Sequence, residues 1–338
     1  MYLLAQRNDC SYNLKENMLN DRTESSNMTI GIIGLSQTVM GILGNFCLLY
    51  HYLLHGHTKG RLRATDLILK HLTISNSLII LSEGVPQTVV AFGLKHFLNY
   101  FGCKLLMYVQ RVGRSVSICM TCLLSVFQTI MISPMNSCWK DLKLKAPKYI
   151  GFSVSLCWIL YMVVNVIVPM YELYMFGKGS VENIVKKRYF EYCSANEQKK
   201  INGLIYVALI VFPEVSFTMI IIWTSGSMVF ILYRHKQQVQ HIHKNNTSHR
   251  SSPESRAILS ILILVSSFLS FQTLSSTFHL CIALTDHPNL WLVNATHLIS
   301  VCFPTVSPFL LMSSDSTLSR LCFAWIRNTK FPNLITKI

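Results

Sequence analysis

Four ionisable side chains interrupt long apolar runs of this sequence. Glu83 lies in the second run, Arg111 and Arg114 lie in the third, and Glu214 lies in the fifth. The two arginines are three residues apart, so they share one face of a helix. Guanidinium groups pair with carboxylate, sulfate or phosphate groups, and carboxylates balance positive charge. These residue types predict either ion pairs between helices or recognition of a polar group on a ligand.

The four side chains are expected at similar depths. At about 1.5 Å per residue, Arg111 and Arg114 lie ~12 and ~16 Å along their helix from its start near Cys103. Glu83 lies ~16 Å and Glu214 ~14 Å from the corresponding ends of their helices. Because a charge in hydrocarbon is costly, such residues are candidates for function. Pairing that only holds the helices together is the alternative.

Other side chains, most of them polar, fall on the same helix faces. Met107, Tyr108 and Ser115 align with the two arginines, and Ser275 falls on a polar face of the sixth run. Small-molecule sites are usually apolar pockets with a few convergent polar groups, and the arginine pair favours an anionic headgroup on an apolar ligand. We therefore predict a compact, mostly apolar ligand bound by these residues: Glu83, Tyr108, Arg111, Arg114, Gln272, Ser276 and His279.

The elements that carry these residues are long apolar runs. The chain is 51% hydrophobic and 13% charged, about half the charged share of a soluble domain. A spanning helix needs about 20 mostly apolar residues. The pattern predicts an all-α fold, a seven-transmembrane helical bundle with a short cytoplasmic amphipathic helix. The expected spans are Thr29–His51, Leu67–Leu94, Leu105–Ile132, Tyr149–Tyr171, Ile205–Tyr233, Ala257–Leu284 and Leu290–Met312.

Basic residues predict the orientation of the bundle. The segments on the C-terminal side carry sixteen Lys and Arg residues and those on the other side carry eleven. By the positive-inside rule, the C-terminus is cytoplasmic and the N-terminus is extracellular, in a multi-pass protein of the plasma membrane. We expect an extracellular tail over 1–28, a seven-helix transmembrane domain over 29–312 and a cytoplasmic tail over 313–338. In that tail, Asp315 to Thr317 can cap the amphipathic helix.

The cysteines and sequons add three expectations. Cys103 and Cys193 lie on the oxidising outer side, where a bridge would hold the long outer loop over the pocket; two free thiols are the alternative. Six other cysteines fall inside apolar runs and are expected mostly as small core residues. Asn27 heads a sequon in the polar N-terminal tail and is the expected glycosylation site. No charged region with a cleavage site precedes the first apolar run, so we expect no removable signal peptide.

Several classes of function are disfavoured by missing motifs. The formal net charge of +15 would suggest nucleic acid, yet no nucleic-acid motif is present, and we assign the excess charge to loops that face lipid headgroups. No phosphate loop, HExxH pair or nucleophile elbow occurs, so an enzyme is not expected. No Cys or carboxylate lies near His241 and His243 at the spacing that metal ligands need. We expect no cofactor and no metal.

The ordered strings of the chain resemble one family along nearly its whole length. They resemble the vomeronasal type 1 receptors, which are G-protein-coupled chemosensory receptors. Glu83 departs from this resemblance, because relatives often carry a basic residue at that position. The strings are LSEGVPQ (81–87), RVGRSVSICMTCLLSVFQTIMISP (111–134), KAPKYIGFSVSLCWIL (145–160), GSMVFILYRHKQQVQHIH (226–243), SPESR (252–256), FPTVSPF (303–309) and SRLCFA (319–324).

The resemblance implies a function. It implies a receptor that binds a small-molecule semiochemical from outside and activates an inhibitory-type heterotrimeric G protein through its cytoplasmic loops. A bitter-taste-type receptor is the nearest alternative, although the strings at 226–243 and 252–256 argue against it. A secondary transporter is the alternative from another class, and it would predict repeat symmetry, which the sequence lacks.

Overall fold

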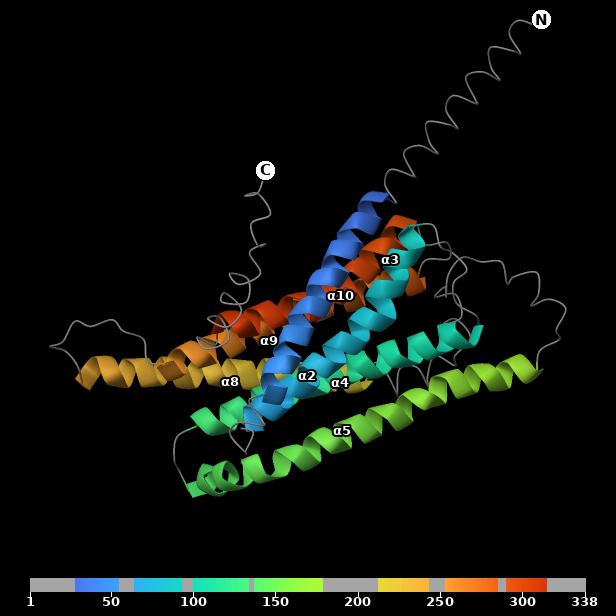
Figure 1. The fold of residues 1–338 in the computed structure, drawn as a ribbon. Coiled ribbons are helices and arrows are strands. Elements are labelled where there is room, and N and C mark those ends of the chain that lie inside the picture. The colour runs from blue at the N-terminus through green and yellow to red at the C-terminus, as the bar shows by residue number, and fades with distance from the viewer. Residues whose placement is uncertain are drawn as a thin grey trace, which may run out of the picture.

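The computed structural model describes seven stretches of the chain: residues 28–54, 64–92, 100–133, 137–178, 212–242, 253–284 and 290–314. Every regular element within them is helical (Figure 1). Seven of these helices are long and apolar enough to cross a membrane. The predicted all-α seven-helix bundle is therefore confirmed. The amphipathic helix expected after Met312 and the tail before Met28 lie outside the described residues.

The helix bounds follow the predicted spans but extend past several of them. The largest difference concerns α5, which begins at Ser137, twelve residues before the predicted Tyr149. The prediction followed the apolar run alone, whereas the lysines and leucines before it are good helix formers. The helices are Met28–Leu54, α2 (Ala64–Ile79), η1 (Ile80–Gly84), α3 (Val85–Ala91), α4 (Tyr100–Ile132), α5 (Ser137–Lys178), α8 (Phe212–Ile242), α9 (Pro253–Leu284) and α10 (Leu290–Ser314).

The second span is interrupted by one π-helical turn. Val85 N–H donates to Ile80 O, five residues earlier, and this bond closes the wider turn η1. Pro86 follows in the first turn of α3, where it has no N–H to donate to the carbonyl of Ser82. The wider turn and the missing donor change the rotation of the helix at this point. Glu83 lies inside η1 and is buried.

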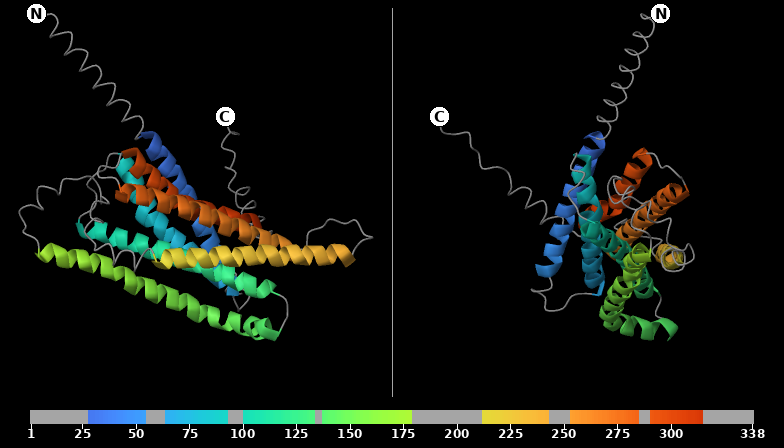
Figure 2. Two further views of the ribbon diagram at one scale, coloured as in Figure 1. Left: turned by 180° about the vertical axis from the view of Figure 1, so that it is seen from behind. Right: turned by 90° about the vertical axis from the view of Figure 1, so that its right-hand side faces the viewer.

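The centre of the bundle is α4. Its most apolar window is 61% buried, whereas the corresponding window of α8 is only 17% buried. Gly113 lets α2 approach α4 closely, because a Cβ there would lie 3.0 Å from Ile79 Cγ1 and 3.2 Å from Ser75 O. Figure 2 shows the other helices arranged around α4. Large apolar side chains on the outer helices, such as Trp223 and Phe152, are exposed, as a lipid-facing surface requires.

Buried amides join the helices across the bundle. Asn45 Nδ2 donates to Pro304 O at 2.9 Å and so links the first helix to α10. That carbonyl needs a donor from outside its helix, because Pro308, four residues later, has no N–H. Asn76 Nδ2 donates to Ser307 Oγ at 2.8 Å, and Ser117 Oγ donates to Asn76 Oδ1 at 3.2 Å. These bonds fix α2 and α4 against α10 at the level of Asn76, which precedes Glu83 in the second span.

Replacing Gly113 with leucine tests the close packing of α2 on α4. We expect Gly113→Leu to destabilise the protein by about 1–3 kcal/mol, because the new side chain must displace backbone and side-chain atoms of α2. Gly226→Leu is the matched control, because nothing lies within 4 Å of its built Cβ. The midpoint of thermal unfolding in detergent measures both. Equal midpoints for the two variants would contradict the close approach of α2 to α4 at Gly113.

Candidate functional site

The buried carboxylate of Glu83 connects η1 to α10. Glu83 is 4% exposed, and its Oε1 accepts a hydrogen bond from Ser300 Oγ. His297 Nδ1 lies 3.0 Å from the same oxygen. Neither His297 nor Ser300 was among the predicted site residues. His297 could have been found, because it is an ionisable side chain inside the seventh apolar run.

Arg114 of α4 interacts with Glu83 on η1 and with α9. Its Nη2 donates to Ser275 Oγ at 3.3 Å. The positive charge of Arg114 acts on the carboxylates of both Glu83 and Glu214, and the charge of Arg111 also acts on Glu214. Interactions between charges are strong where water is excluded. The four ionisable residues selected from the sequence therefore form one electrostatic cluster on η1, α4 and α8.

A small cavity lies beside this cluster. Its volume is about 20 Å³, enough for about one water molecule. Phe268 and Phe303, which pack edge to face with ring centroids 4.8 Å apart, form part of its wall. A ligand can enter only if the surrounding helices separate. The lining residues come from α2, α4, α9 and α10: Ile79, Arg114, Ser117, Phe268, Phe271, Gln272, Ser275, Ile299, Ser300, Phe303 and Pro304.

Two buried polar atoms near the cavity lack hydrogen-bond partners among the described residues. One is Glu83 Oε2, the second oxygen of the buried carboxylate, and the other is Gln272 Nε2, a donor in the cavity wall. Leaving a buried polar atom unsatisfied costs about 1–3 kcal/mol. Unsatisfied buried atoms in a native protein call for an explanation. Here a polar group of a bound ligand would supply the missing partners, because the atoms lie in or beside the wall of a cavity.

The other predicted ligand-binding residues take different positions. Tyr108 OH donates to Met162 O at 3.0 Å, so this side chain faces α5. On α9, Ser275 lines the cavity, whereas its neighbour Ser276 is not among the lining residues. The side chain of His279 lies outside the described residues. The ligand-binding roles of Glu83, Tyr108, Arg111, Arg114, Gln272, Ser276 and His279 stay predictions.

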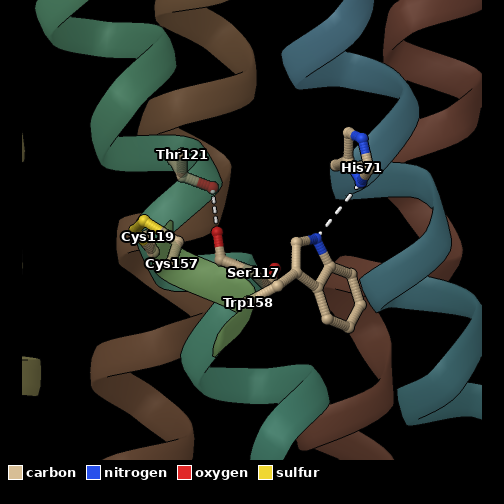
Figure 3. Close-up of a disulfide and its surroundings, with 6 residues drawn as sticks. All are labelled: His71, Ser117, Cys119, Thr121, Cys157 and Trp158. Carbon is tan, nitrogen blue, oxygen red and sulfur yellow. Dashed lines mark hydrogen bonds between the residues drawn. A yellow bond between two sulfur atoms is a disulfide. The ribbon is translucent and has the colours of Figure 1, made fainter. Parts of the chain in front are cut away.

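A disulfide joins the central helix to α5. Figure 3 shows Cys119 of α4 bonded to Cys157 of α5, with a Cα–Cα distance of 6.7 Å. Beside it, Trp158 Nε1 donates to His71 Nδ1 at 3.2 Å and links α5 to α2. The sequence suggested only small core residues at these two cysteines. Two cysteines in one apolar layer carry no signal of pairing until the helix rotations are known.

The structure describes one of the two cysteines of the predicted outer disulfide. Cys103 at the start of α4 is disulfide-bonded. Cys193, its predicted partner, lies outside the described residues, so the pairing stays a prediction. Within the stretches that the structure describes, no group of three or more His, Cys, Asp or Glu side chains could hold a metal ion.

Seven membrane helices around a buried polar cluster and a cavity have the organisation of a seven-helix membrane receptor. The chain matches the vomeronasal organ pheromone receptor family over residues 28–324. It is 54% identical over 300 residues to vomeronasal type-1 receptor 4 of Homo sapiens, covering 89% of this chain and 98% of the relative. The chain belongs to the vomeronasal type-1 receptor family.

Further relatives extend the comparison. The chain is 52% identical over 296 residues to vomeronasal type-1 receptor 2 of Homo sapiens, covering 88% of this chain and 74% of the relative. It is 27% identical over 289 residues to olfactory receptor class A-like protein 1 of Danio rerio, covering 85% and 90%. The protein is thus a multi-pass membrane protein of a chemosensory receptor family and not an enzyme. Family membership decides against the bitter-taste and transporter alternatives.

Removing the carboxylate of Glu83 tests the cluster. We expect Glu83→Ala to destabilise the protein by about 2–4 kcal/mol, because Ser300 and His297 lose their acceptor and Arg114 loses a counter-charge. Glu83→Gln keeps an acceptor oxygen and is expected to lose less. Thermal unfolding of the purified protein ranks the variants, with Thr273→Ala on an exposed position of α9 as the control. A midpoint for Glu83→Ala equal to that of the control would contradict this role.

Peptide mapping tests the disulfide between α4 and α5. We expect a non-reduced digest to contain one linked peptide with Cys119 and Cys157, and alkylation of the denatured, non-reduced protein to leave both unlabelled. Cys122 and Cys302 are free thiols in the structure and serve as internal controls that alkylate. Labelling of Cys119 and Cys157 to the same extent as these two controls would exclude the bond.

Proposed function

We propose that this protein is a G-protein-coupled pheromone or semiochemical receptor. It binds a small, largely apolar ligand in the cavity between α2, α4, α9 and α10, and it activates an inhibitory-type heterotrimeric G protein. The observation that carries the proposal is the pair of unsatisfied buried atoms, Glu83 Oε2 and Gln272 Nε2, at the cavity and its polar cluster. Membership of the vomeronasal type-1 receptor family supports it.

The cavity favours a particular kind of ligand. Its walls combine aromatic and aliphatic side chains with a few polar groups, which is the usual composition of a small-molecule site. Gln272 Nε2 would donate to an oxygen of the ligand, and Glu83 Oε2 would accept a hydrogen bond from a ligand hydroxyl or a water molecule. Arg114 adds a second donor in the cavity wall, where an anionic group would gain the most.

Ligand binding would shift the bundle between two states. The cavity of about 20 Å³ is too small for a semiochemical, so the ligand must favour a state in which α9 and α10 lie further from α4. A ligand group that replaces Ser275 as the partner of Arg114 would release one polar contact between α4 and α9. Pro86 and Pro304 lie where their helices can bend, since each leaves a carbonyl without its helical donor.

The proposed orientation places the N-terminus outside and the C-terminus in the cytosol of a cell with this receptor in its plasma membrane. The exposed lysines at the start of α5 support it, because basic residues concentrate on the cytoplasmic side. Asn27 would then carry a glycan outside, and the cytoplasmic loops would contact the G protein. Protease protection in sealed vesicles with a tag at each end distinguishes this orientation from the reverse one.

The first experiment is G-protein activation in cells that express the chain. We expect a response to at least one apolar small molecule in a panel that contains neutral and anionic members, and pertussis toxin should abolish it if the G protein is of the inhibitory type. Untransfected cells and a second receptor with a known ligand are the controls. A silent panel despite confirmed surface expression would count against the proposed ligand class.

Gln272→Leu tests the place of binding. With an active ligand, we expect this variant to raise the half-maximal concentration by about 10-fold, because a buried hydrogen bond of about 1–3 kcal/mol is lost. Thr273→Ala, an exposed neighbour on α9, is expected to respond like the unmodified protein. Arg111→Ala combined with Arg114→Ala should affect anionic ligands most. An unchanged dose response in Gln272→Leu, at equal surface expression, would place the ligand elsewhere.

A further inference from the structure

We propose that residues 140–149 of α5 form a binding surface for anionic phospholipid headgroups at the end of the bundle where α2 begins. This segment, the basic turn, contributes no residue to the lining of the cavity. The proposal does not depend on the identity of the ligand or of the G protein. It depends only on the protein lying in a membrane, which the seven apolar helices require.

The charges of the basic turn have one dominant sign. Lys140, Lys145 and Lys148 are exposed, Lys143 is half-buried, and Asp141 is the one acidic residue of the segment. Lysine is a compact cation that pairs with phosphate as a point charge. Clusters of four or more basic residues beside a membrane helix attract anionic lipid, and the attraction falls off within about 10 Å of the surface at 0.1 M salt. The basic turn has the charge that such lipid recognition needs.

The apolar residues of the basic turn point to a membrane surface and not to water. Leu144 is 73% exposed, Tyr149 is 55% exposed and Leu142 is 43% exposed. In the same turns, Ala146 packs against the core and Ile150 is buried. The segment is therefore fixed to the bundle by one face, while its exposed positions combine lysines with Leu142, Leu144 and Tyr149. This is the composition of helices that lie at the headgroup boundary.

The length and shape of α5 place this face at the headgroups. A helix of 42 residues is about 63 Å long, whereas the hydrocarbon core is about 30 Å thick. The first turns of α5 also run at a steep angle to the rest of the helix, most clearly at the bottom of the right-hand view of Figure 2. Pro147 removes one helical hydrogen bond in the early turns of α5, and prolines are a common cause of helix bends. The basic turn thus extends across the end of the bundle and not through the bilayer.

The two kinds of side chain have separate roles in this surface. Lys140, Lys145 and Lys148 would pair with lipid phosphates, and their aliphatic stems would lie along the apolar side chains. Leu142 and Leu144 would enter the boundary with the acyl chains. A lipid satisfies both groups at once, whereas a soluble phosphate satisfies the lysines alone. The surface therefore selects an intact anionic phospholipid over its free headgroup.

Lipid retention by the full-length protein tests the proposal. The protein is reconstituted in nanodiscs of phosphatidylcholine with 10 mol% phosphatidylserine, extracted, and analysed by native mass spectrometry without ligand or G protein. We expect phosphatidylserine to be retained preferentially, and Lys140→Gln, Lys145→Gln and Lys148→Gln together to reduce this preference by about tenfold or more. Lys186→Gln, Lys187→Gln and Arg188→Gln together remove the same charge beyond the other end of α5 and should leave it unchanged.

The apolar contribution is tested separately. Leu142→Ser with Leu144→Ser keeps every charge and should also reduce retention of phosphatidylserine, while soluble glycerophosphoserine at millimolar concentration should not displace the lipid from the unmodified protein. Thermal unfolding checks that each variant is folded. Full retention by the lysine variant, an equal loss in the 186–188 control, or displacement by the soluble headgroup would each overturn the proposal. Failure here would leave the chemosensory function standing, because that function is measured by ligand response.

Discussion

The hydrocarbon core of a membrane offers no water to a polar group, and the structure of this receptor follows from that constraint. Each carbonyl that loses its helical donor needs another one inside the protein. The carbonyl of Pro304 is the clearest example, because Pro308 cannot donate to it and the amide of Asn45 does so from the first helix. A sequence feature that weakens α10 thus becomes a link between two helices. The same proline leaves α10 able to bend while its orientation is held.

The constraint is stronger for charges, and it determines where function can lie. Glu83 would be too costly in hydrocarbon without donors, and the π turn η1 directs it to Ser300 and His297 on α10. The positive charge of Arg114 acts on the carboxylates of Glu83 on η1 and Glu214 on α8, and Arg114 also donates to Ser275 on α9. One cluster therefore contacts most of the helices that surround the cavity. A ligand that exchanges partners with this cluster changes contacts on several helices at once, which is how a small molecule can shift a whole bundle.

The sequence predicted the helices well and the contacts between them poorly, for one physical reason. Hydrophobic runs report that a helix lies in a membrane, but not how it is rotated about its axis. Glu83, Arg111, Arg114 and Glu214 were selected because a charge in an apolar run is visible without any rotation. The difference between Ser275 and Ser276 is a rotation of about 100°, and only packing decides it. The link between Cys119 and Cys157 requires two such rotations together, and η1 requires a local change of helical period that no apolar pattern reveals.

Packing is uneven around the central helix. The apolar window of α4 is 61% buried, while those of α5, α8 and α9 are 22%, 17% and 22% buried. The outer helices therefore turn much of their surface away from the bundle, and each is held by a few specific contacts. The helix α2 is fixed to α4 through Gly113 and the amide of Asn76, and α5 is fixed to α4 through a disulfide. The bond between Arg114 and Ser275 joins the most buried helix to one that is largely exposed on the outside of the bundle. Exchange of that bond for a bond to a ligand would loosen α9 from α4, whereas the close packing at Gly113 and the disulfide would still hold α2 and α5 against α4.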